Sequence, residues 1–198
     1  MLAAARRYFE PSKERLGATL GRWGIRPSWV TLSGLALALL AAYIYGRWGP
    51  FWAALCGTAA SLTDFVDGAV ARYQGKESAW GNYLEAVVDR LVELTLLLTM
   101  ACDLGPVVAW AIASSMFISY CKPRVALVVA TDNHDWPGVG DHADRMVVIL
   151  VSMALCQVSL WLAQLGLGLL VAMTASLVLG VIATVVPLRI GIRAFERM

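Results

Sequence analysis

Four carboxylates stand at short, regular spacing in a largely apolar part of the chain. Asp64 and Asp67 are three residues apart, and Glu85 and Asp89 are four apart, so each pair projects from one face of its own helix. An ionised carboxylate in an apolar setting is costly unless it is paired or bound to a metal. Four such groups facing one another would repel strongly, and a pair of divalent cations is the simplest way to stabilise the cluster. We therefore predict a site for two Mg²⁺ or Mn²⁺ ions, which prefer carboxylate oxygens.

A dinuclear carboxylate site of this kind suits chemistry on a diphosphate. Two ions can clamp the diphosphate and stabilise charge on the leaving oxygen. Gly68 and Ala71 leave space beside the acids, and Arg72 can pair with a phosphate. One carboxylate could also deprotonate an incoming hydroxyl. The residues thus favour transfer of a phosphoryl-type group from a diphosphate donor to an alcohol.

The helices that carry the acids are expected to cross a membrane. The chain has 198 residues, of which 59% are hydrophobic and 15% charged, and several apolar stretches approach the ~20 residues that span a bilayer. We predict an all-α polytopic membrane protein in which residues 1–198 form a single domain, with the transmembrane bundle over 29–193. Gly166 and Gly168 are expected to form the short outer turn between the fifth and sixth transmembrane helices. The six predicted transmembrane helices cover 29–46, 51–72, 81–102, 106–130, 145–164 and 168–189.

The N-terminal segment and the basic residues predict an orientation. Residues 1–24 resemble an amphipathic helix on the membrane surface, which Pro11 could divide; the alternative is a frayed basic leader. The segment lacks the long apolar run of a cleavable signal peptide. Of the 16 Lys and Arg residues, 14 fall in the N-terminal segment, the second and fourth connections and the C-terminal tail. We therefore predict that both termini and the acidic site face the cytoplasm of a bacterial or archaeal cell.

The longest polar connection, 131–144, holds both histidines of the chain, His134 and His142, among four aspartates. No spacing there resembles a known metal-ligand motif. We predict a solvated loop rather than a metal site. The cysteines show no paired spacing and are expected to be buried free thiols; they are Cys56, Cys102, Cys121 and Cys156.

The acidic motif closely resembles the signature of the CDP-alcohol phosphotransferase family, also called the CDP-alcohol phosphatidyltransferases. In this chain it reads Asp64-x2-Asp67-Gly68-x2-Ala71-Arg72-x8-Gly81-x3-Glu85-x3-Asp89. Three further segments are similar to family patterns at the starts of helices 1 and 5 and on helix 4; they are 26–31, 140–145 and 119–124. One position departs, because Glu85 stands where the family normally has aspartate. Glutamate keeps the charge but adds a methylene and one more torsion to fix.

The resemblance implies a phosphatidyltransferase of phospholipid biosynthesis. A substituted phosphoryl group would pass from a CDP-alcohol, most often CDP-diacylglycerol or a related CDP-lipid, to an acceptor alcohol, and CMP would leave. It implies two bound Mg²⁺ or Mn²⁺ ions, with Asp64, Asp67 and Glu85 as ligands and Asp89 as the general base that also touches a metal. The family is usually homodimeric, and no nucleic acid is involved. The implied donor-binding residues are Ser28, Thr31, Gly68, Ala71, Arg72 and Ser78.

Basic residues near the predicted cytoplasmic side are candidates for the acceptor site. If two or three of them converge on one cavity, the acceptor is anionic, such as a phosphorylated polyol. Their alternative role is to anchor the helices by the positive-inside rule. The candidates are Lys122, Arg124, Arg145 and Arg193, with Arg189 beside them.

Three other hypotheses remain open for the acids. A buried ion-pair network would use Arg72 and Arg90, although two arginines cannot neutralise four carboxylates. A transporter would use intramembrane acids as an ion path, yet the acids all lie at one end. An inactive family member would bind CDP-lipids without turnover, with Glu85 as the lesion. Release of CMP from a CDP-lipid distinguishes the enzyme from all three.

Overall fold

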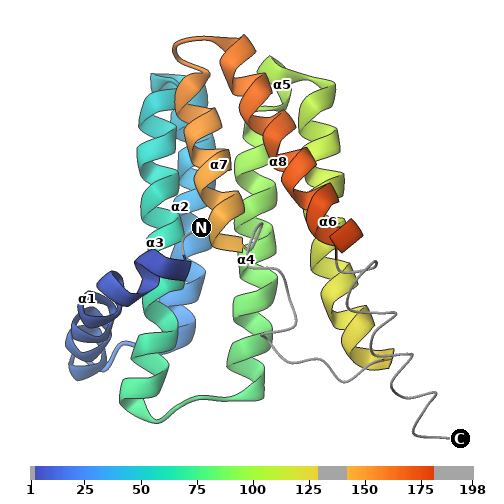
Figure 1. Cartoon of the computed structure of the whole chain (residues 1–198). Helices are drawn as coiled ribbons and strands as arrows, with labels where there is room; N and C mark the ends of the chain where they lie inside the picture. The colour runs from blue at the N-terminus through green and yellow to red at the C-terminus, as the bar shows by residue number, and fades with distance from the viewer. Residues whose placement is uncertain (1–2, 129–141, 181–198) are drawn as a thin grey trace, which may run out of the picture.

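A computed structural model of the chain describes residues 3–128 and 142–180. Within these ranges the chain is all-helical and contains no strand, as predicted. Most of the helices run roughly side by side as a bundle, and α1 lies at an angle against one end of it (Figure 1). The helices are α1 Ala3–Arg22, α2 Pro27–Trp48, α3 Pro50–Gln74, α4 Ala79–Thr99, α5 Ala101–Leu104, α6 Pro106–Val128, α7 His142–Leu155 and α8 Leu160–Gly180.

The first helices lie close to their predicted positions. Proline opens both α2 and α3, where its fixed φ suits the first helical position and its missing N–H costs nothing. The N-terminal helix is continuous across Pro11 and is not divided there. The stretch predicted as 81–102 ends earlier, at Thr99, and the single-turn α5 follows it.

The predicted turn at Gly166 and Gly168 is wrong, because both residues lie inside α8. The connection between α7 and α8 instead covers 156–159. A Cβ added at Gly166 would collide with the hydroxyl of Ser152 on α7. The glycine therefore allows two helices to approach closely, which is a common use of small residues between apolar helices.

The N-terminal helix α1 is docked on α3 rather than lying free. A Cβ added at Gly17 would stand 2.5 Å from the Cβ of Ala69 and 2.8 Å from its backbone carbon. One turn later, a Cβ at Gly21 would collide with the ring of Tyr73. Two glycines one turn apart thus let the backbone of α1 rest against α3. This contact fixes α1 over the end of α3 that carries the acidic motif.

Small residues also bring the bundle helices together. Ala38, Ala41 and Ala53 are completely buried in the core shared by α2 to α8. A Cβ at Gly57 would lie 2.8 Å from Leu150 of α7 and 3.2 Å from a side chain of α4, so α3 packs tightly between its neighbours. The small residues of this helix therefore serve helix packing.

The outer surface of the bundle is rich in large apolar side chains. Trp52, Leu98 and Leu169, on three different helices, are each more than half exposed. Among the described residues, α2 is the one helix that by length and composition could cross a membrane, and shorter apolar stretches occupy 106–121 and 160–172. The six-span count stays a prediction. The four cysteines are free, as predicted, but none is fully buried: Cys102 is exposed and the other three are partly buried.

Candidate active site

A cavity of about 440 Å³ opens among α1, α2, α3 and the start of α4. Three of the four motif acids line it, namely Asp64, Asp67 and Glu85. All six residues predicted to bind the donor line it as well; they are Ser28, Thr31, Gly68, Ala71, Arg72 and Ser78. The cavity therefore combines an acidic wall with groups suited to a nucleotide and its phosphates.

Three further cations line the same cavity and were not singled out from the sequence as site residues. Arg26 directly precedes the segment with Ser28 and Thr31, and Lys76 follows Arg72 by four residues. This closeness in sequence to predicted donor-binding residues could have identified both cations. Lys13 reaches the cavity from α1, where its ammonium lies 4.8 Å from the centroid of the Phe65 ring. Its presence depends on the docking of α1, which local sequence patterns do not reveal.

Asp67 is the most firmly held of the motif acids and is 3% exposed. The hydroxyl of Thr31 on α2 donates a hydrogen bond to Oδ2 of Asp67 at 2.7 Å. The backbone N–H of Gly68 donates to Oδ1 at 2.6 Å. Thr31, predicted to contact the nucleotide, thus also fixes the orientation of a motif carboxylate. Ser78 likewise has a structural role, because its hydroxyl caps α4 by accepting from the N–H of Gly81 at 3.0 Å.

Two groups of side chains could each hold a metal ion. Asp64, Asp67 and Glu85 each offer an oxygen, and these atoms lie within 4.8 Å of one another. Asp64, Asp89 and His142 offer a second set within the same limit. Asp64 belongs to both groups and could bridge two ions. Such spacing fits the carboxylate pairs that clamp diphosphates through two cations.

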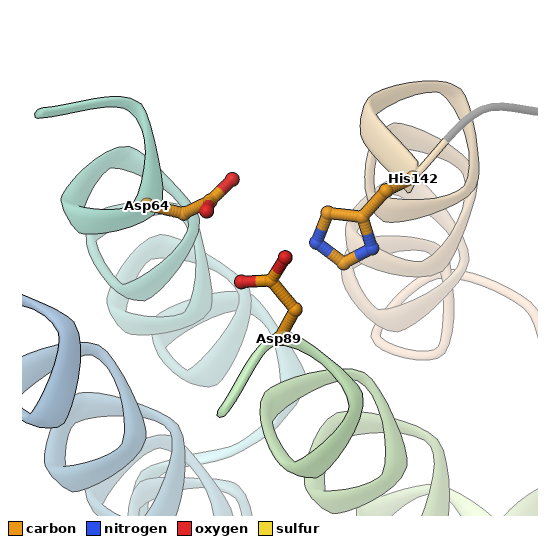
Figure 2. A group of neighbouring side chains, drawn as sticks. All are labelled: Asp64, Asp89 and His142. Atoms are coloured by element: carbon orange, nitrogen blue, oxygen red, sulfur yellow. The ribbon is translucent and has the colours of Figure 1, made fainter. Parts of the chain in front are cut away.

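Asp89 does not line the large cavity but a second, much smaller one, of about 10 Å³. This space is shared with Asp64, Asp67 and His142 and is close to what one water-sized particle needs. Figure 2 shows Asp64 and Asp89 projecting from neighbouring helices toward each other, with the His142 ring facing them from α7. The carboxyl groups of Asp64 and Asp89 are close enough to share a hydrogen bond. Two carboxylates this close need a proton or a cation between them.

The predicted solvated loop at 131–144 is wrong for its last residues. His142 begins α7, and Asp144 lies in the first turn of that helix and is 8% exposed. An acidic residue in this position is favoured by the positive end of the helix dipole. The partners of His142 are far away in the sequence, so local polarity could not reveal them. The rest of the segment, including His134, lies outside the described residues.

A fifth carboxylate, which the sequence interpretation did not use, lies next to this group. Glu93 follows Asp89 by one helical turn and is completely buried. Its Oε1 accepts hydrogen bonds from the Ser115 hydroxyl and from Nε of Arg145, the latter at 2.9 Å. Its Oε2 accepts from Nη1 of Arg90 at 2.7 Å and from Nη2 of Arg145 at 3.1 Å. The repeated four-residue spacing after Glu85 was the signal that could have identified it.

The arginines of the ion-pair hypothesis both have partners outside the motif. Nη2 of Arg72 donates to Glu14 of α1 at 3.0 Å, and both side chains are about half exposed. Arg90 forms its ion pair with Glu93. Within the described residues, neither arginine forms a salt bridge with the four motif acids, which leaves those acids for another cation.

The predicted acceptor residues are placed very differently. Arg145 is 2% exposed and held in the buried cluster around Glu93, not on the cavity wall. Arg124 is exposed, with its guanidinium carbon 5.7 Å from the centroid of the Tyr120 ring. The side chain of Lys122 and the whole of Arg189 and Arg193 lie outside the described part of the chain.

Comparison with known proteins decides the family. The model of the CDP-alcohol phosphatidyltransferase family matches residues 25–186. The chain belongs to this family. CDP-alcohol phosphatidyltransferases similar to it include the archaetidylinositol phosphate synthase of Pyrococcus horikoshii, 30% identical over 157 residues, or 77% of this chain and 81% of that protein. The phosphatidylinositol phosphate synthase of Streptomyces avermitilis is 31% identical over 161 residues, or 75% of this chain and 64% of that protein.

Solved structures of a CDP-alcohol phosphatidyltransferase share the fold. The phosphatidylinositol phosphate synthase of Mycobacterium tuberculosis with CDP-DAG bound superposes with a TM-score of 0.74 at 21% identity, covering 87% of this chain and 92% of that one. The same protein in complex with manganese and citrate gives a TM-score of 0.66 at 19% identity, covering 82% and 83% of the two chains. The family model and the sequence relatives confirm the predicted family and the predicted transferase class.

Proposed function

We propose that this CDP-alcohol phosphatidyltransferase moves a substituted phosphoryl group from CDP-diacylglycerol, or a related CDP-lipid, to a phosphorylated polyol. The observation that carries the proposal is the cavity of about 440 Å³ in which motif acids and several cations line the same space. Relatives of the chain are named for making archaetidylinositol phosphate and phosphatidylinositol phosphate. An inositol phosphate is therefore the proposed acceptor.

The donor diphosphate would lie along the cavity between the acids and the cations. Gly68 and Ala71 leave room against α3, while Arg26, Arg72 and Lys76 supply positive charge for phosphate oxygens. Because Arg72 is paired with the exposed Glu14, a phosphate would compete with a weak surface ion pair. The arginine can thus be released to the donor at small cost.

The chain supplies a set of carboxylates suited to divalent cations. Asp64, Asp67 and Glu85 would hold one ion, and Asp64 and Asp89 would contribute to a second. When bound, two Mg²⁺ or Mn²⁺ ions supply positive charge that stabilises the diphosphate and the departing CMP. The bridging position of Asp64 in both groups, and the hydrogen bonds that orient Asp67, support this assignment.

Asp89 is the proposed general base. The acceptor hydroxyl loses its proton to Asp89 as its oxygen bonds to the phosphorus that carries the lipid alcohol. The bond from that phosphorus to the bridging oxygen breaks, and CMP leaves with the bonding pair. Asp89 suits this role because it lies beside Asp64 and Asp67 but outside the large cavity proposed for the donor.

The same proposal includes a membrane setting. The chain would form one domain that crosses the bilayer six times, with α1 on the cytoplasmic surface and both termini in the cytoplasm. The outward apolar side chains of the bundle support this setting, and so does the close docking of α1 at the end where the cavity opens. A homodimer remains part of the proposal.

Release of CMP from CDP-diacylglycerol tests the proposal. The detergent-purified chain is assayed with an inositol phosphate, with glycerol 3-phosphate and with no acceptor, in Mg²⁺, in Mn²⁺ and in excess chelator. We expect turnover with the inositol phosphate, and we expect it to vanish with chelator and return with either metal. Asp64→Asn should abolish turnover, whereas Asp103→Asn, which changes an acid of α5 bonded to Tyr45, should retain it.

Two results would contradict the proposal in different ways. Full turnover in excess chelator would exclude the metal site as the source of activity. Donor binding without CMP release from any acceptor would instead support the inactive CDP-lipid binder.

A further inference from the structure

We propose that His142 is a ligand of the second metal ion, through its Nε2 atom, beside Asp64 and Asp89. This inference rests on the proposed metal-dependent function and adds a nitrogen ligand from α7 to a site otherwise made of carboxylates. The acidic motif does not contain this residue, because it lies 53 positions after Asp89 in the sequence.

The position of the ring supports coordination. A ring nitrogen of His142 and an oxygen from each of the two aspartates lie within 4.8 Å of one another. The side chains meet at a cavity of about 10 Å³, enough for one small ion. Figure 2 shows that one nitrogen of the ring faces the two carboxylates, while the other faces away from them. Three side chains from three helices thus surround one small space.

The contacts of the far nitrogen identify which atom is free to coordinate. Nδ1 of His142 lies 3.1 Å from Nη1 of Arg90 and 3.4 Å from Oε2 of Glu93. The nitrogen that faces the carboxylates is therefore Nε2. An arginine can only donate, whereas the glutamate can only accept when ionised. Nδ1 therefore accepts from Arg90 as the ring stands, which leaves the ring proton on Nε2. A metal on Nε2 would select the other tautomer, in which Nδ1–H faces Oε2 of Glu93 at 3.4 Å and Arg90 keeps its contact with Glu93 at 2.7 Å.

This arrangement matches the support that metal-binding histidines usually have. Such a histidine almost always donates its other N–H to a carboxylate or carbonyl, which fixes the ring and raises its basicity. Glu93 is suited to this supporting role because it is completely buried and held by Ser115, Arg90 and Arg145. Glu93 already accepts from these donors, and in the metal-bound tautomer it would also face Nδ1–H of His142, so it would orient the ligand rather than bind the ion.

A histidine ligand would change the preference between the two candidate metals. Imidazole is a better ligand for transition-metal ions such as Mn²⁺ than for Mg²⁺, which favours oxygen ligands and gives up water reluctantly. We therefore infer that the site formed by Asp64, Asp89 and His142 favours Mn²⁺ over Mg²⁺. Removal of the imidazole should reduce that preference while the carboxylates still bind metal.

Pulsed electron paramagnetic resonance of bound Mn²⁺ tests the ligand directly. The full chain, purified without a polyhistidine tag, is loaded with Mn²⁺ in detergent, and the spectrum is examined for coupling to a directly coordinated ¹⁴N nucleus. Mn²⁺ and Mg²⁺ affinities are measured in parallel by calorimetry. The variants are His142→Gln and, as the matched control, His134→Gln, which changes the other histidine of the chain.

We expect ¹⁴N coupling in the wild type and in His134→Gln, and its loss in His142→Gln. The affinity of one Mn²⁺ ion should fall at least ~10-fold in His142→Gln, comparable to the loss of a supporting group around a metal, with a smaller change for Mg²⁺. Bound Mn²⁺ without ¹⁴N coupling in the wild type would overturn the inference and leave the proposed function standing, even if His142→Gln failed to fold. Failure of the wild type to bind Mn²⁺ at all would overturn both.

Discussion

Replacing Glu93 with glutamine would remove a carboxylate that pairs with a buried arginine. Glu93 is completely buried, Arg145 is 2% exposed, and two hydrogen bonds of 2.9 and 3.1 Å join them. Removal of one partner from a buried ion pair costs about 3–5 kcal/mol, because the remaining charge loses that counter-charge. We expect Glu93→Gln and Arg145→Met each to lower the free energy of unfolding by about that amount.

The double variant is the decisive measurement. With both of these charges gone, neither is left without the other, and Arg90, which also loses Glu93, is 28% exposed and can be hydrated, so the combined loss should be smaller than the sum of the single losses by about 1–3 kcal/mol. The assay is unfolding of the detergent-solubilised protein by added SDS, followed by loss of helical circular dichroism. Glu10→Gln, at an exposed position of α1, should change stability by less than about 0.5 kcal/mol. Losses that simply add would show that Glu93 and Arg145 do not act as a pair.

Three further predictions concern activity, measured as CMP release. Asp89→Asn should reduce turnover by at least ~10²-fold, the effect of losing a general base, with little change in donor affinity; normal turnover would rule out this role. Glu85→Gln should abolish activity and Glu85→Asp retain part of it, whereas equal rates for the two would show that Glu85 is not a ligand. Gly17→Leu should raise the KM for the donor more than it lowers kcat, because its Cβ would collide with Ala69 at 2.5 Å and displace α1 from the cavity; unchanged kinetics would mean that α1 contributes nothing there.

The acidic motif could be predicted because its information is local. Asp64 and Asp67 lie on one helix, and Glu85 and Asp89 on another, so helical periodicity alone places each pair on one face. The apolar composition of α2 to α4 likewise fixed their approximate limits. What the spacing could not show was the relative placement of the two helices, which depends on close contacts such as that of Gly57 with Leu150 and a leucine of α4.

The part of the site contributed by α7 could not be predicted, because it depends on contacts between residues far apart in the sequence. His142 contacts Arg90 of α4, and Arg145 contacts Glu93 of the same helix. In each pair the two residues are 52 positions apart in the sequence. A polar segment rich in aspartate looks like a solvated loop whether or not its last residues begin a buried helix. For the same reason Arg145, whose charge suggested an anionic acceptor, could not be matched with Glu93 from the sequence.

The pairing of Arg90 with Glu93 has a consequence for the biogenesis of the protein. Arg145 is made 52 residues after Glu93, so it cannot neutralise this glutamate when α4 first leaves the ribosome. Arg90 can, because it lies three residues before Glu93 on the same helix and reaches its Oε2 at 2.7 Å. In the proposed six-span arrangement, α4 thus enters the bilayer with its own counter-charge, which lowers the cost of inserting an ionised side chain. The arrival of α7 then completes the pairing, so the order of synthesis and the order of charge neutralisation coincide.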